Sequence, residues 1–512
     1  MIRFFLSLAF VPLFAGTARD WPHAAGPSGN FVSEGEAPRA FSVSENESIV
    51  WRTKLPSTGQ GTPVVSRGKV FVTSHEVISE DTELGTAILG LCFDAHTGEE
   101  LWRRRIPGTR TTDLSSLFSD NTAASAVADG QRVIFVNVGG TVTCFDYEGD
   151  QLWSHRWTPF GRHHARAHEP ILYDGKVILM HAPLYDLPVS ATTKNGSRAL
   201  GRGRDYWTHL RAYHVKSGKL AWQAEAGTSV HSTSVIGRVA GDGRYAILTG
   251  RGGGHQPPEE PYGLSLVDAA TGKTIRDFAI KDYAAAQNAN WSSRKAHFFA
   301  GREHRSIDLA SGRLLDSVAL FEKVSQSKRS GGVYEKIKNG SFAKSKKPIT
   351  YFTNLLVGKY HFFRSYGGFF IGRVNLESGK VEYLQVPVQV VREPGTTERK
   401  LWDKSVSNDM ENADGFKATQ DKRNAGSGWG HVSSAPPIVV GDLIYFPTMV
   451  GMVYVLKWGV ENLGKEALVS ISDLGAAGKT WSLSGLAYYD GYLYARTMKE
   501  LICIGGQRGP AQ

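Results

Sequence analysis

Histidine, arginine and tryptophan side chains recur beside the apolar runs of this chain, and they are the residue types best suited to binding chemistry. Histidine and arginine donate charge-assisted hydrogen bonds, and a tryptophan ring offers a flat apolar face. Gathered in a concave mouth, such groups suit an anionic or sugar-like ligand. The ligand-binding candidates are Arg162, His163, His168, His231, Arg251, His255, Trp291, His431 and Trp481.

Each candidate also has an ordinary structural role. A histidine at the start of a strand is commonly a hydrogen-bonded structural residue, and Trp291 and Trp481 could pack between sheets. The adjacent residues His163 and His164 lack a carboxylate at metal-ligand spacing, so no metal site is predicted. No residue is assigned a catalytic role.

A repeat supplies the elements that would position these side chains. It contains two hairpins, the first turning at Asp-Gly or Arg-Gly and the second turning at Thr-Gly or Ser-Gly after an Asp. Glycine accepts the positive φ of such turns, which sets the hairpin register. The fullest copy joins residues 63–72 to residues 92–102. Related second hairpins occupy residues 145–153, 213–222, 267–273, 307–313 and 375–380, and further first hairpins occupy residues 437–445 and 487–494.

This count predicts a ring of eight four-stranded sheets, or blades, with seven as the alternative because the copies are degenerate between residues 281 and 430. Residues 49–55 form an outer-strand pattern without a preceding repeat, whereas the last copy ends without an outer strand. We therefore expect the N-terminal strand to complete the last blade, which leaves no exposed sheet edge. Trp102, Trp153 and Trp222 are expected to fill the spaces between blades.

The segment from Phe93 to Trp102 resembles the core of the pyrroloquinoline-quinone (PQQ)-like repeat, Asp-Ala-x-Thr-Gly-x-x-x-Trp. The lead beginning Asp20-Trp-Pro resembles the start of secreted bacterial PQQ-like repeat proteins. The resemblance spans nearly the whole mature chain and implies an all-β, eight-bladed propeller of antiparallel blades. It also relates the chain to quinoprotein dehydrogenases and to an outer-membrane assembly propeller, so it implies a fold more specifically than an activity.

The N-terminus indicates export. Arg3 precedes an apolar run over residues 4–14 and small residues ending at Ala18, which is the pattern of a secretory signal peptide. The run is too short to span a bilayer, and no cysteine follows it for lipid attachment. We expect a signal peptide over 1–18, an N-terminal extension over 19–46 and a single propeller over 47–507, located in the periplasm or outside the cell.

Insertions concentrate on one face of the predicted ring. The hairpin turns share one face, here called the short-turn face, and all other connections share the opposite, elaborated face. Long loops on one face of a rigid scaffold indicate binding, although drift in unconstrained loops is an alternative. The insertions are 74–88, 107–120, 158–167, 182–208, 251–262, 281–289, 321–348 and a lid-like 388–430. Side chains just before the innermost strands should point to the axis there: Asn121, His168, Glu169, His231, Asn290, Trp291, His431 and Trp481.

Charge and cysteine content add two expectations. The formal net charge is +10, and the insertion 321–348 holds eight lysines and arginines against two glutamates. That basic insertion is either a solvated loop or a docking surface for a polyanion. Cys92, Cys144 and Cys503 occupy one equivalent repeat position, so they should be buried and too far apart for disulfides. No nucleic-acid-binding module is recognisable.

Three functions from different classes fit these observations. The first is a binding or assembly scaffold, with an anionic polysaccharide, an envelope component or a protein as the partner. The second is a carbohydrate-active enzyme of the lyase type, using a histidine base and arginine on an acidic polysaccharide. The third is a PQQ-dependent oxidoreductase. PQQ and calcium are suggested by the family name only, because the chain has no adjacent cysteine pair and no calcium-binding motif.

Overall fold

The computed structural model describes most of the chain as β-strands. Within the described ranges the one helical element is the 3-10 turn Lys465–Ala467. The described residues are 20–77, 83–109, 112–113, 120–159, 169–181, 207–227, 233–241, 243–252, 260–283, 288–330, 333–342, 349–365, 368–387, 389–392, 399–402, 436–476 and 479–505.

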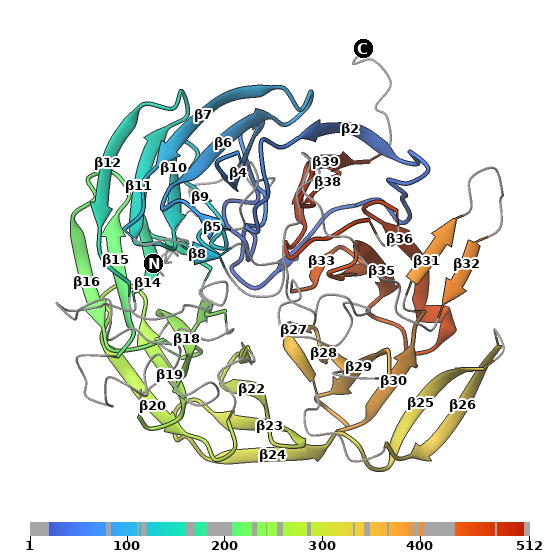
Figure 1. Ribbon diagram of the computed structural model, residues 1–512. Helices are drawn as coiled ribbons and strands as arrows, with labels where there is room; N and C mark the ends of the chain where they lie inside the picture. Colours follow the sequence, from blue (N-terminus) through green and yellow to red (C-terminus); the bar gives the residue numbers. More distant parts are fainter. Residues whose placement is uncertain are drawn as a thin grey trace, which may run out of the picture.

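Eight blades surround a central axis, as predicted (Figure 1). Each contains four antiparallel strands, and the first strands of blades 8, 1, 2 and 3 contact one another in turn, as do those of blades 4, 5 and 6. Blade 1 contains β3 (Val64–Ser66), β4 (Lys69–His75), β6 (Ile88–Asp94) and β7 (Glu100–Ile106), and blade 2 contains β9 (Val127–Ala128), β10 (Arg132–Asn137), β11 (Thr141–Asp146) and β12 (Gln151–Arg156). Blade 3 contains β13 (Ile171–Tyr173), β14 (Lys176–His181), β15 (His209–His214) and β16 (Leu220–Ala224), and blade 4 contains β17 (Val235–Arg238), β18 (Tyr245–Arg251), β19 (Gly263–Asp268) and β20 (Thr274–Ala279). Blade 5 contains β21 (Asn290–Ser292), β22 (Lys295–Ala300), β23 (Glu303–Asp308) and β24 (Leu314–Ala319), and blade 6 contains β27 (Ile349–Val357), β28 (Tyr360–Ser365), β29 (Phe370–Asn375) and β30 (Val381–Gln385). Blade 7 contains β33 (Ile438–Val440), β34 (Leu443–Pro447), β35 (Met452–Lys457) and β36 (Leu468–Asp473), and blade 8 contains β37 (Ala487–Tyr489), β38 (Tyr492–Arg496), β39 (Glu500–Ile504) and β2 (Ile49–Lys54).

The N-terminal strand closes the ring. β2 pairs antiparallel with β39, with Trp51 opposite Cys503, so the last blade takes its outer strand from the start of the chain. This pairing confirms the predicted closure. It also makes blade 8 depend on both ends of the sequence, because no single segment supplies all four of its strands.

Tryptophan and glycine interlock consecutive blades. The indole of Trp102 donates a hydrogen bond of 2.9 Å to the carbonyl of Tyr147 in the next blade, and a Cβ on Gly149 would lie 3.0 Å from the same ring. The turn glycine therefore leaves room for the ring as well as accepting a positive φ. The same bond joins Trp51 to Ala95, Trp153 to Val215 and Trp222 to Ala269. These tryptophans are inter-blade packing residues, as expected.

The three cysteines lie in the third strands, each directly opposite one of these tryptophans. All three are buried and unpaired, which confirms the sequence prediction. Burial raises the pKa of each thiol to about 12, so none forms the thiolate that reacts near neutral pH.

The segment from residue 20 to residue 35 crosses the axis on the short-turn side. Trp21 exchanges backbone hydrogen bonds of 2.8 and 3.0 Å with Val65 of β3, and the carbonyl of Pro22 accepts one from Ala128 of β9. Further along, β1 (Val32–Ser33) pairs in parallel with β33. Trp21 and Phe31 are buried within the core. The N-terminal extension therefore joins the inner strands of blades 1, 2 and 7.

The basic insertion is partly folded, not simply a loop. β25 (Val324–Ser330) and β26 (Val333–Gly340) form a hairpin that adds to the outer edge of blade 6 through parallel pairing with β30. It projects from the ring (Figure 1). Its exposed lysines on β26 discourage pairing with another strand at that edge. Two small two-stranded sheets complete the described strands. In one, β5 (Glu83–Leu84) pairs with β8 (Thr112–Asp113), and the other is the hairpin of β31 (Gln389–Arg392) and β32 (Arg399–Trp402).

Candidate functional site

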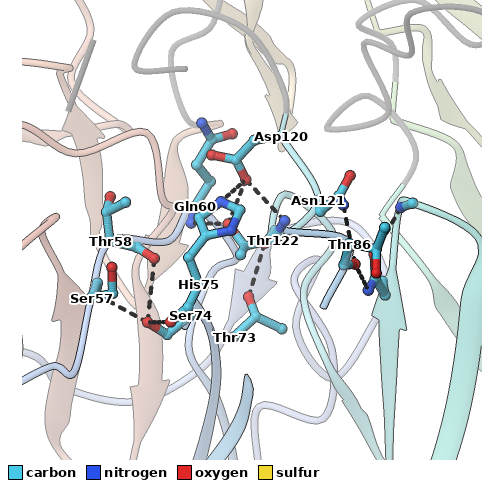
Figure 2. Close-up of polar contacts among 12 residues, drawn as sticks. Ser57, Thr58, Gln60, Thr73, Ser74, His75, Thr86, Asp120, Asn121 and Thr122 are labelled. Carbon is cyan, nitrogen blue, oxygen red and sulfur yellow. Dashed lines mark hydrogen bonds and ion pairs between the residues drawn. The ribbon is translucent and has the colours of Figure 1, made fainter. Parts of the chain in front are cut away.

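Buried polar side chains gather where the chain enters the innermost strands of blades 1, 2 and 8. They lie on the elaborated face, because they precede β3, β9 and β37 or end β4 and β38. Figure 2 shows the part of this cluster around blades 1 and 2. Its members are Ser57, Thr58, Gln60, Thr62, Thr73, Ser74, His75, Asp120, Asn121, Thr122, Ser125, Ser482, Ser484 and Arg496, all of them buried.

Side-chain hydrogen bonds to the backbone hold these entry segments close to the blades. Ser74 at the end of β4 donates to the carbonyls of Ser57 and Thr58 at 3.0 and 3.3 Å. Thr73 donates to the carbonyl of Thr122 at 2.8 Å. A Cβ on Gly59 would lie 2.5 Å from the Thr73 carbonyl oxygen, so only glycine allows this approach.

His75 and Asp120 form the centre of the cluster. The Nε2 atom of His75 lies 3.3 Å from Oδ1 of Asp120, and both side chains are 1% exposed. The same oxygen accepts hydrogen bonds from the amide and hydroxyl of Thr122 at 2.9 and 2.6 Å, and the Thr122 hydroxyl accepts from the Gln60 amide at 3.0 Å. The entry of blade 2 thus places a carboxylate oxygen beside an imidazole nitrogen from blade 1 (Figure 2), although neither ring nitrogen of His75 has a hydrogen-bond partner among the described residues.

Arg496 adds a cation from blade 8. Its guanidinium is fully buried, and Nη1 donates to the carbonyl of Thr73 in blade 1. Burial lowers its pKa to about 9, while the negative charge of Asp120 acts in the opposite direction. An arginine without water around it is costly unless its donors are used. The remaining N–H donors of Arg496 therefore need hydrogen-bond acceptors.

Several polar atoms of the cluster have no hydrogen-bond partner among the described residues. Buried polar atoms in proteins are nearly always hydrogen-bonded, and each exception costs about 1–3 kcal/mol. The unpartnered atoms are Ser57 Oγ, Thr58 Oγ1, Nδ1 and Nε2 of His75, Asp120 Oδ2, and Nε and Nη2 of Arg496. Their concentration at one junction, where both donors and acceptors are left without partners among the described residues, indicates a binding site.

The structure locates three of the nine predicted ligand-binding residues. Arg251 is buried and donates to Ser265 and to the carbonyls of Glu225 and Glu260, so its described contacts lie within the fold. Trp291 packs beside Gly237 of blade 4. Trp481 is buried in the core, and the next residue, Ser482, donates to the carbonyl of Arg496 at 2.6 Å. Arg162, His163, His168, His231, His255 and His431 lie outside the described residues.

The other predicted axis-facing residues separate into two groups. Asn121 lies within the cluster, and Glu169 accepts a hydrogen bond of 2.9 Å from the Ser125 amide at its border. Asn290 lies apart, bonded to Asn354 at 2.7 Å between blades 5 and 6. Convergence on the elaborated face is thus found around blades 8, 1 and 2.

Sequence reasoning missed the central members of the cluster, His75, Asp120 and Arg496. The small-residue run Ser-Thr-Gly-Gln-Gly-Thr over 57–62 could have signalled a close approach before the first repeat. His75 and Arg496 could have been found as polar residues that end otherwise apolar second strands, but nothing local indicates that they meet Asp120.

The described residues do not supply a calcium-binding set. Calcium takes six to eight oxygen ligands, usually with several carboxylates. Within the described ranges no group of three or more His, Cys, Asp or Glu side chains is placed to hold a metal ion. Asp120 is the carboxylate at the centre of the cluster, and its Oδ1 atom is already engaged by His75 and Thr122.

Comparisons with known proteins agree on the repeat and the fold. The family model described as outer membrane protein assembly factor BamB matches residues 14–117 and 89–242. No curated protein sequence matches the chain.

Solved structures match over nearly the whole chain. The quinohemoprotein alcohol dehydrogenase of Comamonas testosteroni is 12% identical, with 96% of this chain and 82% of that chain covered and a TM-score of 0.52. The quinohemoprotein alcohol dehydrogenase ADHIIG of Pseudomonas putida HK5 is also 12% identical, with 97% and 82% covered and a TM-score of 0.52. BamB from Moraxella catarrhalis is 12% identical, with 91% and 99% covered and a TM-score of 0.45. At these identities the likeness concerns the fold alone.

Proposed function

This chain is an eight-bladed β-propeller of PQQ-like repeats, and we propose that it is an exported binding or assembly scaffold whose ligand or partner engages the elaborated face. The repeat determines how the blades are built, whereas the function depends on the residues of the site. An envelope component, a polysaccharide or a protein is the partner class that this proposal covers.

The difference between the two faces carries the proposal. On the short-turn side the N-terminal segment is bonded to inner strands of blades 1, 2 and 7. On the elaborated side, five described residues from blades 8, 1 and 2 together have unpartnered buried polar atoms, whereas His23 is the residue of the N-terminal segment that has them. A rigid scaffold whose polar groups and long connections gather on one face is suited to binding at that face.

Export is supported by the leader pattern at residues 1–18, which lies outside the described residues. No helix among the described residues is long and apolar enough to cross a membrane. The proposed location is the periplasm or the cell exterior.

A carbohydrate-active enzyme is the second candidate, because one observation favours it. A histidine beside a carboxylate, with neither ring nitrogen hydrogen-bonded among the described residues, supplies the parts of a general base. His75 would then abstract the proton from the sugar carbon next to the carboxyl group, the neighbouring glycosidic C–O bond would break to leave a carbon–carbon double bond, and the leaving oxygen would take up a proton from solvent. Asp120 would stabilise the imidazolium. Release of unsaturated products from acidic polysaccharides, lost in His75→Gln, would favour this candidate over the scaffold.

A blocking experiment tests which face binds. Val77 is 67% exposed on the elaborated face, and Ser217 is exposed on the short-turn face. The native thiols are buried, so Val77→Cys and Ser217→Cys can each be modified selectively with a bulky polyethylene glycol maleimide. Separated envelope proteins, polysaccharides and lipids are then tested for retention on each immobilised protein.

Retention that is lost on modifying Val77→Cys and kept on modifying Ser217→Cys is the expected result. Equal loss in both, or loss with Ser217→Cys only, would assign binding to another surface. Absence of retention with all three fractions would overturn the scaffold proposal.

A further inference from the structure

We propose that the junction of blades 8, 1 and 2 is a binding site for a neutral saccharide, recognised through its hydroxyl groups by Arg496, Asp120, His75 and Thr58. This inference deepens the proposed function and rests on it. It assigns a ligand class to one place on the elaborated face.

The chemistry of the unpartnered atoms selects hydroxyl groups. The guanidinium of Arg496 can only donate, and the ionised carboxylate of Asp120 can only accept. A group that bonds to both must accept from one and donate to the other, which a hydroxyl does. The hydroxyls of Ser57 and Thr58 can take either role. Adjacent hydroxyls on one sugar ring would satisfy several of these atoms together.

The charges favour a neutral ligand over an anionic one. Arg496 and Asp120 carry opposite charges and act on each other electrostatically, yet no ion pair joins these two described residues. The cluster therefore has little net charge, and an anion attracted by the guanidinium would also face the Asp120 carboxylate. The sequence analysis expected either an anionic or a sugar-like ligand, and the charges of the cluster favour the sugar-like one.

Buried water is the competing explanation. A water molecule also donates and accepts, but it makes only two to four hydrogen bonds, typically with groups from one small cavity. Seven atoms without a partner among the described residues are contributed here by five residues of two blades and the entry of a third. A larger ligand with several hydroxyls accounts for more of them at once.

The test measures binding of defined sugars to the whole mature protein by titration calorimetry. The probes are the neutral trisaccharides maltotriose, cellotriose and chitotriose, with trigalacturonate as the anionic comparison. At least one neutral probe should bind, and it should bind more tightly than trigalacturonate.

Thr58→Val is the decisive variant. It replaces an unpartnered hydroxyl with a methyl group of the same shape, so the melting temperature should not fall. Affinity for the neutral probe should weaken by about 3- to 10-fold, which is the loss of one hydrogen bond. Arg496→Gln should weaken it by more than about 10-fold, because its bonds are charge-assisted. Ser217→Ala on the short-turn face is the matched control and should bind normally.

Several results would overturn the inference. Tighter binding of trigalacturonate would assign the site to anions. Unchanged affinity in both Thr58→Val and Arg496→Gln would place the sugar elsewhere. If no sugar binds while an envelope fraction is still retained through the elaborated face, this inference fails and the proposed function stands. If retention also fails, the proposed function fails with it.

Discussion

Three buried histidines between blades 5 and 6 should make this protein lose stability in mild acid. The Nε2 atom of His304 lies 3.0 Å from Nδ1 of His361, and Nε2 of His361 lies 3.0 Å from Oδ1 of Asn354. His297 lies between the hydroxyls of Ser292 and Ser306 at 2.9 and 2.8 Å. All three imidazoles are at most 2% exposed.

Burial is the main cause of their depressed pKa values. It lowers the pKa of His297 to about 4 and that of His304 to about 3, and it moves the pKa of His361 well below the ordinary 6.5. Lys295 adds to the effect at His297, Asp316 opposes it, and neighbouring histidines repel each other's protonated forms. In the folded protein all three therefore stay neutral in mild acid.

The sign of the effect follows from proton binding. Below pH 6.5 the unfolded chain takes up protons on these histidines, whereas the folded chain does not until about pH 4 or lower. Stability is thus fully present above pH 6.5 and falls as the pH decreases. At pH 5.5 each histidine costs ~1.4 kcal/mol, and the three together cost ~4 kcal/mol, a large part of a typical domain's stability.

The measurement is chemical unfolding at pH 7.5 and pH 5.5. His297→Gln keeps a donor and an acceptor near both serines but cannot take up a proton, so its loss of stability between these pH values should be smaller by ~1.4 kcal/mol than that of the unsubstituted protein. His214→Gln, at an exposed position, is the control and should not reduce the loss. The same loss in His297→Gln as in the unsubstituted protein would refute the reasoning.

Three further predictions concern packing. Ala at Gly237 would overlap the indole of Trp291, so Gly237→Ala should destabilise the fold by ~2–3 kcal/mol in denaturant unfolding. Gly459, whose Cβ would meet open space, is the control, and an equal effect in Gly459→Ala would contradict the prediction. Trp21→Ala should lower the free energy of unfolding by ~3–5 kcal/mol in the same measurement, because the ring is fully buried. A decrease below ~1 kcal/mol would show that the segment from residue 20 to residue 35 contributes little to stability. The thiols of Cys92, Cys144 and Cys503 should resist iodoacetamide in the native protein and react fully in denaturant, as intact mass would show; native labelling would contradict their burial.

The sequence by itself determined the blades and how they join. The residues that define the blades contact residues a few positions away or in the next copy of the repeat. They are the turn glycines, the Asp before each of them and the outer tryptophans. Their spacing therefore predicts strands, register and blade count. Trp51 facing Cys503 could be anticipated on the same basis, because a strand pattern without a partner at one end matched a missing strand at the other.

Only the tertiary structure decided which polar groups meet. The Nη1 atom of Arg496 bonds to Thr73, 423 positions earlier, because ring closure brings blade 8 against blade 1. Asp120 reaches His75 from the neighbouring blade through a connection whose course no repeat specifies. Repeat periodicity fixes the angle and order of the blades, but a side chain's partners depend on loops that do not repeat. The sequence analysis therefore did not name His75, Asp120 and Arg496, because their meeting depends on packing between blades.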